Sequence, residues 1–265
     1  MIEFDGVGVG YDGRQVLEEI SFSVGPGSLT ALVGPNGCGK TTLLRAAARR
    51  ITPETGRILV DGKPVELYQR REFARAVAFL PQQRPIPAIP VRALVSHGRF
   101  PYLGLSRRLR AEDRQAVERA MADAGVADWA QRDLRELSGG ERQRVYLAMA
   151  LAQNAGTILL DEPTTYLDLR AQFELLGLLR RLADQGVCIL LVIHELALAL
   201  RYSDRMVLLD GGRLVAAAPP RQLTQQGWID RVFGVRARLT GTGCWFEPTQ
   251  EEKQDETPTD LDREL

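Results

Sequence analysis

A glycine-rich segment near the N-terminus has the residue types and spacing of a phosphate-binding loop. Gly34 is followed five positions later by Gly39, and Lys40 and Thr41 come next. In such loops the glycines let backbone N–H groups point at phosphate oxygens, the lysine adds positive charge and the hydroxyl ligates a divalent cation. A plain glycine turn is the alternative. We expect phosphate contacts from eight residues: Gly34, Asn36, Gly37, Cys38, Gly39, Lys40, Thr41 and Thr42.

Lys40 is unusual in this chain because nearly all basic residues are arginines. Of 34 basic residues only Lys40, Lys63 and Lys253 are lysines. A planar guanidinium does not fit a narrow phosphate cradle, whereas an ammonium acts there as a point charge. We therefore expect Lys40 to bridge the β- and γ-phosphates of a nucleotide and to take part in catalysis.

Two carboxylates follow an apolar run later in the chain. Asp161 and Glu162 come directly after residues 157–160, at the carboxyl end of a predicted strand, where open parallel sheets bind ligands. Asp161 would hold Mg²⁺ together with Thr41, and Glu162 would accept a proton from the attacking water or polarise it. Capping of the next helix is the alternative use of an Asp-Glu-Pro sequence. The glycine loop 120 residues earlier favours nucleotide chemistry.

A third segment supplies a hydroxyl and two glycines at the start of a predicted helix. Ser138, Gly139 and Gly140 precede helical residues 141–152. The start of a helix suits an anion because its N–H groups are unpaired. A serine there is also a common helix cap, so the segment alone does not distinguish the two roles.

The elements around these motifs predict an α/β fold. Apolar runs at 29–33, 76–80, 157–160 and 187–193 alternate with helical patterns, as in a parallel sheet covered by helices on both faces. Residues 2–9 and 20–24 alternate apolar and polar side chains, which predicts antiparallel strands. We expect a P-loop NTPase core with a mostly parallel sheet, an N-terminal antiparallel β part and a helical subdomain insert.

Proline and charge patterns suggest how the chain is divided. The proline-rich residues 84–90 cannot form regular structure. We expect the core in residues 1–86 and 154–217, the helical subdomain in 87–153 and an extension without assigned function in 218–247. Residues 248–265 contain seven acidic and two basic side chains, a net charge of −5, and we expect this tail to be disordered.

Composition excludes several classes of protein. With 34 basic and 34 acidic residues the chain carries no net charge, which argues against a nucleic-acid partner. The apolar run at 187–193 has seven residues, whereas a membrane-spanning helix needs about 20. The first residues lack the features of a secretory signal, and three scattered cysteines fit a reducing compartment. We expect a cytosolic location.

The order of the three motifs resembles that of a known family. The sequence Leu137-Ser138-Gly139-Gly140-Glu141-Arg142-Gln143, between the glycine loop and the strand ending in Asp161-Glu162, is similar to the signature of ATP-binding cassette ATPases. The resemblance covers about residues 1–217. It implies that the chain binds ATP and Mg²⁺ and hydrolyses ATP.

Four further residues match motifs of this family. Tyr11 matches an aromatic that stacks on adenine, although packing on a half-buried strand is the alternative. Gln82 is similar to a glutamine that senses Mg²⁺ and the transport partner, and Gln83 beside it leaves that choice open. Asp168 matches the acid of the loop that touches the opposite subunit. His194 matches the histidine at the γ-phosphate.

Two positions depart from the family's usual residues. Glu195 follows His194 where the family often has aspartate, and we expect this change to be tolerated. Cys38 occupies a variable position of the glycine loop. Because it lies near a helix start and Lys40, we expect a lowered thiol pKa, inactivation by alkylating reagents and protection by ATP.

The resemblance also implies a dimer in which two chains enclose two ATP molecules head to tail. Ser138, Gly139 and Gly140 of one chain would complete the nucleotide site of the other. The residues expected to catalyse hydrolysis within their own chain are Glu162, His194, Gln82 and Lys40, and those expected near the metal are Thr41, Gln82 and Asp161.

Within the family, size and motifs favour the ATPase subunit of an importer. Only 97 residues separate Lys40 from Ser138, without the long coiled coil of repair relatives, and membrane helices of the exporter type are absent. The segment 95–102, with Gly-Arg-Phe-Pro, looks like the subgroup that serves iron-siderophore, haem and cobalamin uptake. His97 in this segment is interpreted as structural or partner-facing.

The expected partners follow from that subgroup. They are a second copy of the chain, two permease subunits at the cytoplasmic face of the membrane and, indirectly, an extracytoplasmic substrate-binding protein. Iron chelate is the first choice of cargo. A soluble ABC-type ATPase that acts on a protein or nucleic-acid partner rather than on a permease is the alternative.

Overall fold

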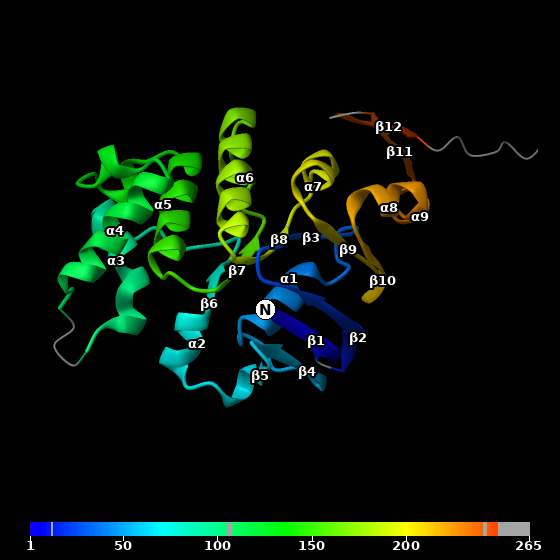
Figure 1. Cartoon of the computed structure of the whole chain (residues 1–265), viewed down its shortest axis with the longest axis horizontal. Coiled ribbons are helices and arrows are strands. Elements are labelled where there is room, and N and C mark those ends of the chain that lie inside the picture. The colour runs from blue at the N-terminus through cyan, green and yellow to red at the C-terminus, as the bar shows by residue number, and fades with distance from the viewer. Residues whose placement is uncertain (12, 105–107, 241–242, 249–265) are drawn as a thin grey trace, which may run out of the picture.

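The computed structural model describes residues 1–11, 13–104, 108–240 and 243–248. One of its sheets is antiparallel, with strand order β2-β1-β4-β5 (Figure 1). Its strands are β1 (Ile2–Tyr11), β2 (Arg14–Val24), β4 (Thr55–Val60) and β5 (Lys63–Pro64). This sheet confirms the expected N-terminal antiparallel part. Asp12, in the turn expected between the first two strands, lies outside the described residues.

A larger sheet has the order β10-β9-β3-β8-β7-β6, and only β10 runs antiparallel to its neighbour. Its strands are β3 (Leu29–Val33), β6 (Val77–Leu80), β7 (Thr157–Asp161), β8 (Cys188–Val192), β9 (Arg205–Asp210) and β10 (Arg213–Ala218). The mostly parallel α/β core is therefore confirmed. The carboxyl ends of β3, β6, β7 and β8 point the same way, so the segments that follow them meet at one edge.

The sheets are joined and covered by short helices. They are α1 (Lys40–Ala47), α2 (Arg70–Ala76), α3 (Val91–Ser96), α4 (Ala111–Asp123), α5 (Gly139–Ala152), α6 (Leu169–Asp184), α7 (Leu196–Tyr202), α8 (Pro220–Gln225) and α9 (Trp228–Phe233). Four 3₁₀ turns occupy Val65–Leu67, His97–Tyr102, Ala127–Trp129 and Leu134–Glu136. None of the helices in the described ranges has the length and apolar character needed to span a membrane.

The larger sheet is buried on both faces because successive strand residues point to opposite sides. Leu32, Leu159 and Leu190 pack on α1 and the antiparallel sheet. Their neighbours along the strands belong to the second hydrophobic cluster, with α5, α6 and α7: Ala31, Val33, Ile158, Leu160, Ile189 and Leu191. The glycine loop and the acidic pair are thus anchored on strands with no freedom to slip in register.

Between β6 and β7 the described residues form helices and turns, which lie to one side of the sheets in Figure 1. A buried ion pair fixes this region internally. Arg99 Nε lies 3.0 Å from Asp113 Oδ1, and Arg99 Nη1 donates to the carbonyl of Ala152 at 2.9 Å. The 3₁₀ turn, α4 and the end of α5 are therefore held together by one side chain.

The chain after β10 forms a small unit that the sequence did not predict. Helices α8 and α9 lead into a hairpin of β11 (Val235–Thr240) and β12 (Gly243–Pro248). Pro248, the first residue of the expected acidic tail, pairs with Val235 in this hairpin. The rest of that tail, residues 249–265, lies outside the described residues.

Candidate active site

The glycine loop lies between β3 and α1, as its predicted role requires. Gly34 cannot carry a side chain, because a Cβ atom there would lie 2.1 Å from the carbonyl oxygen of Leu209. Gly39 caps α1 with a φ of 101°, and a Cβ there would lie 2.4 Å from Leu17 Cδ2. Gly34 therefore follows from close backbone packing, and Gly39 from its left-handed conformation, at the carboxyl edge of the sheet.

Lys40 is buried at the bottom of this loop. Its Nζ donates to the carbonyls of Gly34 and Pro35 at 2.7 and 2.8 Å. The side chain is thereby held across the loop, facing a hollow of about 230 Å³. The hollow is lined by Val16, Asn36, Gly37, Gly39, Lys40, Thr41, Thr42, Glu162 and His194. Residues far apart in sequence thus share one cavity that presents backbone N–H groups and a cation, which suits a polyphosphate.

Asp161 and Thr41 meet at the edge of this hollow. Thr41 Oγ1 donates to Asp161 Oδ1 at 3.0 Å, and the other carboxylate oxygen, Oδ2, is buried with no hydrogen-bond partner among the described residues. Burial is the main cause that raises the pKa of Asp161, and the nearby Glu162 charge raises it further. An unpartnered buried carboxylate oxygen beside a hydroxyl is the oxygen donor set that Mg²⁺ prefers. The residues present therefore fit the expected metal.

The protein supplies only part of a metal coordination shell. Within the described ranges, no group of three or more His, Cys, Asp or Glu side chains is arranged to hold a metal ion. Mg²⁺ is usually bound by one or two protein oxygens together with water and substrate phosphates. Thr41 and Asp161 match that mode of binding, and would hold the ion together with the nucleotide.

Glu162 lies at the centre of a polar cluster. Gln82 Nε2 donates to its Oε2 at 2.5 Å, His194 Nε2 lies 2.7 Å from its Oε1, and Thr165 Oγ1 donates at 3.3 Å. Its backbone has a φ of 51°, a strained conformation for a residue with a side chain. Three donors from the loops after β6, β7 and β8 therefore fix the carboxylate beside the hollow.

Cys38 corrects one of the sequence expectations. Its thiol is buried and its pKa is raised, because desolvation outweighs the attraction of Lys40. The expected lowering of the pKa was therefore wrong. The position near a helix start suggested an exposed thiolate, but the loop folds over the sulfur and keeps water away from it.

The signature segment begins α5 and does not line the hollow that contains Lys40. Ser138 Oγ accepts a hydrogen bond from the N–H of Glu141 at 3.3 Å, and Glu141 Oε2 accepts one from the N–H of Ser138 at 2.7 Å. Within one chain, Ser138 therefore acts as a helix cap. It leaves the anion role open, since a hydroxyl can still donate to a further group.

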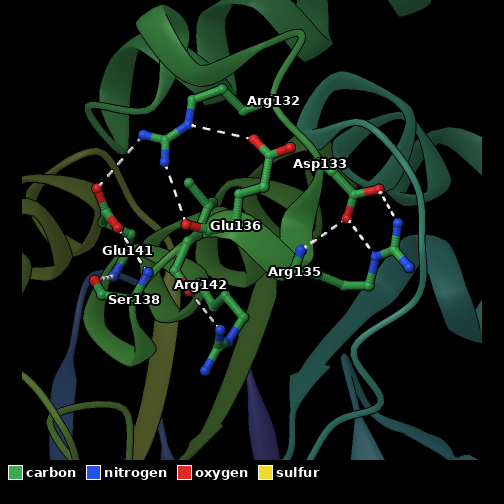
Figure 2. Close-up of polar contacts among 8 residues, drawn as sticks. Arg132, Asp133, Arg135, Glu136, Ser138, Glu141 and Arg142 are labelled. Carbon is green, nitrogen blue, oxygen red and sulfur yellow. Dashed lines mark hydrogen bonds and ion pairs between the residues drawn. The ribbon is translucent and has the colours of Figure 1, made fainter.

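Charged side chains surround this helix start (Figure 2). Arg132 Nη1 lies 3.9 Å from Glu141 Oε1, and hydrogen bonds from the backbone and hydroxyl of Ser138 lower the pKa of Glu141. Ser138 and Gly139 themselves are exposed. The segment is thus rigid but open, which suits a surface that meets another molecule.

Two other predicted residues lie outside the hollow. Tyr11 is 43% exposed at the end of β1, and the hollow's lining does not include it. Asp168 caps α6, where its Oδ1 accepts from the N–H of Ala171 at 2.8 Å. Near it, Tyr166 is 82% exposed, and a Cβ placed on Gly139 would lie 3.6 Å from its Cβ. The signature and the loop before α6 therefore form one exposed surface.

Sequence reasoning missed several supporting residues. Thr165 donates to Glu162, and Val16 lines the hollow from β2. Thr164 Oγ1 donates to Glu195 Oε2 at 3.1 Å and ties the loop after β7 to that after β8. Thr165 was close enough to Glu162 in sequence to be suspected, whereas Val16 has no pattern that would reveal it.

Comparisons with known proteins agree with this geometry. A family model described as ABC transporter matches residues 17–165. The iron(3+)-hydroxamate import ATP-binding protein FhuC of Bacillus subtilis is 40% identical over 88% of this chain and 87% of its own length. The hemin import ATP-binding protein HmuV of Streptomyces coelicolor is 44% identical over 86% of this chain and 81% of its own length. A dimeric bacterial ABC transporter cassette has a TM-score of 0.75 and 26% identity, covering 83% of this chain and 99% of that one.

Proposed function

Because this chain belongs to the ABC transporter family, we propose that it is the ATP-hydrolysing subunit of an importer for metal chelates. An iron-siderophore complex is the first choice of cargo, followed by cobalamin or haem. The observation that carries the hydrolytic part is the convergence of Gln82, His194 and Thr165 on Glu162, beside Lys40. The similarity to siderophore and hemin import proteins over most of both chains supports the choice of cargo.

The residues of the hollow account for ATP binding and hydrolysis. Lys40 and the N–H groups at the start of α1 bind phosphate oxygens, and Thr41 and Asp161 hold Mg²⁺. The metal, when bound, offsets negative charge on the phosphates. Glu162 accepts a proton from water, and Gln82 and His194 hold its carboxylate in position. Tyr11 stays the proposed adenine contact.

Catalysis in this proposal needs a second copy of the chain. Ser138, Gly139 and Gly140 are exposed or half-exposed and lie away from the hollow of their own chain. We assign them to the nucleotide held by the partner, with Asp168 in the adjoining exposed loop. The dimeric structure of a similar cassette supports this arrangement. Closure of the dimer then completes both sites, so binding of the partner controls hydrolysis.

The permease is proposed to dock on the helical region that follows Gln82. Phe100 is 55% exposed, lies against the His97 ring in a tilted arrangement with ring centres 4.5 Å apart, and lines a hollow of about 320 Å³ with Arg71, Leu103 and Gly104. An apolar, exposed groove of this size suits a short helix of another protein. This contact would place the chain at the cytoplasmic face of the membrane.

Reconstitution tests the proposal. The chain is co-expressed with the permease encoded beside its gene, placed in vesicles with the neighbouring binding protein, and assayed with ferric siderophore, haem and cobalamin in turn. We expect one chelate to stimulate ATP hydrolysis and to accumulate in the vesicles. Glu162→Gln, which keeps the hollow and removes the proton acceptor, should bind ATP without uptake. If the purified chain hydrolyses ATP but the permease does not purify with it, the importer proposal is contradicted.

A further inference from the structure

Arg84 is a half-buried cation that none of the expected roles uses. It follows Gln82 by two residues, in the segment between β6 and α3. Its Nε donates to the carbonyl of Pro81 at 2.7 Å, and its Nη2 donates to Gln143 Oε1 at 2.6 Å. Its Cζ lies 4.8 Å from the centre of the Tyr146 ring. Among the described residues, Arg84 forms no ion pair with a carboxylate.

Partial burial of this arginine removes some of its contact with water, which disfavours its charge. Desolvation lowers the pKa of Arg84 to about 10, although Tyr146 and Asp161 act in the opposite direction. A cation held in this way without a paired carboxylate stays only where its hydrogen bonds are well formed. The geometry therefore points to a role in holding particular groups together.

Gln143 extends the contact from Arg84 to the catalytic loop. This glutamine is buried on α5, and its Nε2 donates to the carbonyl of Pro163 at 2.7 Å. An amide side chain can accept from one group and donate to another at the same time. Pro163 follows Glu162, and Glu162 accepts from Gln82. The contacts thus close a ring through the loop after β6, the loop after β7 and α5.

We propose that Arg84 is a positioning residue that locks the start of α5 to the loop carrying Glu162. Gln143 lies five residues after Ser138, about 7.5 Å along the same rigid helix, so a shift at one is transmitted to the other. The inference rests on the proposed function, because it matters for catalysis only if Ser138 completes the site of a partner. Arg84 then connects the nucleotide site of its own chain with Ser138, which completes the nucleotide site of the partner.

Arg84→Met tests this role in the full-length chain. We expect kcat for ATP hydrolysis to fall about tenfold, as for loss of one charge-assisted hydrogen bond. The Kd for ATP should stay within about twofold, because Arg84 does not line the hollow of Lys40. Arg84→Lys, which keeps the charge and one donor, should recover part of kcat. Equal loss in kcat and ATP affinity, or no loss in kcat, would overturn the proposal.

A matched control and a second variant separate positioning from folding. Arg92→Met removes an exposed arginine of the same region, paired with Glu118, and should leave kcat unchanged. Gln143→Leu should lower kcat about as much as Arg84→Met, and the double variant should lose no more than either alone. If the two losses in kcat multiply in the double variant, Arg84 and Gln143 act independently, which would contradict the ring of contacts. Melting temperatures show whether each variant is folded.

Hydrogen exchange tests the inference without nucleotide. Amides of residues 138–142 should exchange faster in Arg84→Met than in Arg92→Met, because α5 loses its tie to the catalytic loop. Equal exchange in both variants would overturn the inference. Since this measurement needs neither ATP nor a permease, its failure is distinguishable from failure of the proposed function.

Discussion

The two parts of the proposed ATP site are built differently within one chain. Lys40 and Asp161 are buried to 6% and 1% exposure and are held by backbone carbonyls and a threonine hydroxyl. Ser138 and Gly139 are exposed, and the surface side chain of Glu141, which Arg132 approaches, holds the N–H of Ser138. We call these the buried part and the exposed part of the site.

This difference follows from what each part has to do. The buried part must offer desolvated charges, because electrostatic contacts are stronger away from water. The exposed part must be free to meet a partner, so only the capping box and weak surface ion pairs can orient it. Substitutions in the buried part should therefore change both stability and turnover strongly. In the exposed part, only loss of the contacting groups themselves should have a large effect.

Mixed dimers test whether the two parts belong to different chains. Lys40→Ala and Ser138→Arg should each reduce turnover at least about 100-fold, because each removes a phosphate-facing group or blocks its approach. Mixing the two variants should restore activity, since a chain with intact Lys40 can be completed by a chain with intact Ser138. Random pairing gives intact sites at about a quarter of the wild-type number. ATP hydrolysis against mixing ratio measures this.

Mixing either variant with itself is the control, and neither should recover. Absence of recovery in the mixed sample, with both variants folded and soluble, would mean that the two parts act within one chain. The comparison between them would then have no functional basis.

Asp161→Asn tests how much stability the chain loses by burying the charge of Asp161. Turnover should fall about 100-fold with loss of the metal-holding charge. The nucleotide-free chain should instead become more stable by about 1 kcal/mol at pH 8, because burial disfavours the charged carboxylate. Since the folded-state pKa of Asp161 is raised, wild type regains this stability as the pH falls and the group is protonated. Urea unfolding at pH 8 and pH 5 measures the change.

The exposed carboxylate Asp128 provides the control for this experiment, and Asp128→Asn should leave stability unchanged at both pH values. If Asp161→Asn were less stable than wild type at pH 8, burial of the Asp161 charge would not be what destabilises the chain. The hydrogen bond from Thr41 to the carboxylate would then contribute more to stability than the burial of the charge removes.

Local patterns predicted the parts of the structure that depend on local chemistry. The glycine loop, the carboxylates after residues 157–160 and the strands around them were predictable because spacing and strand ends place them at one edge. The helix cap at Ser138 was also predictable, since serine followed three residues later by Glu141 is a capping box. For Ser138, the helix-cap role and the proposed phosphate-binding role require the same geometry at the start of α5.

Long-range packing decided what the sequence could not reveal. The contact of Arg84 with Gln143 joins residues 59 apart, and the burial of Cys38 depends on how the loop closes over it. Helix α2 has only seven residues, too few for a clear apolar period, and α8, α9 and their hairpin lack a regular pattern. These features depend on neighbours that only the folded chain supplies.

The thiol of Cys38 gives a smaller test of the buried part. Because burial raises its pKa, iodoacetamide at pH 7 should label it slowly in the native chain, with half-buried Cys244 labelled first. Unfolding in urea should make all three cysteines react at similar rates. Mass spectrometry of peptides at several times measures the order. Cys38 reacting first in the folded protein would restore the original expectation of an activated thiol and mean that the loop opens in solution.

Glu141→Gln should have the smallest effect, and it tests the exposed part. The lowered pKa of Glu141 means that its charge stabilises the folded chain above the usual pKa of glutamate, and that this contribution is lost as the pH falls. Glutamine still accepts from the N–H of Ser138, so the loss at pH 7 should be about 0.5 kcal/mol and should disappear near pH 3. Glu136→Gln, at an exposed residue nearby, is the control and should change stability less than Glu141→Gln at pH 7. Turnover should stay within about twofold, because the capping geometry survives. A tenfold loss would show that the exposed part depends on charge as strongly as the buried part does, and the comparison between them would fail.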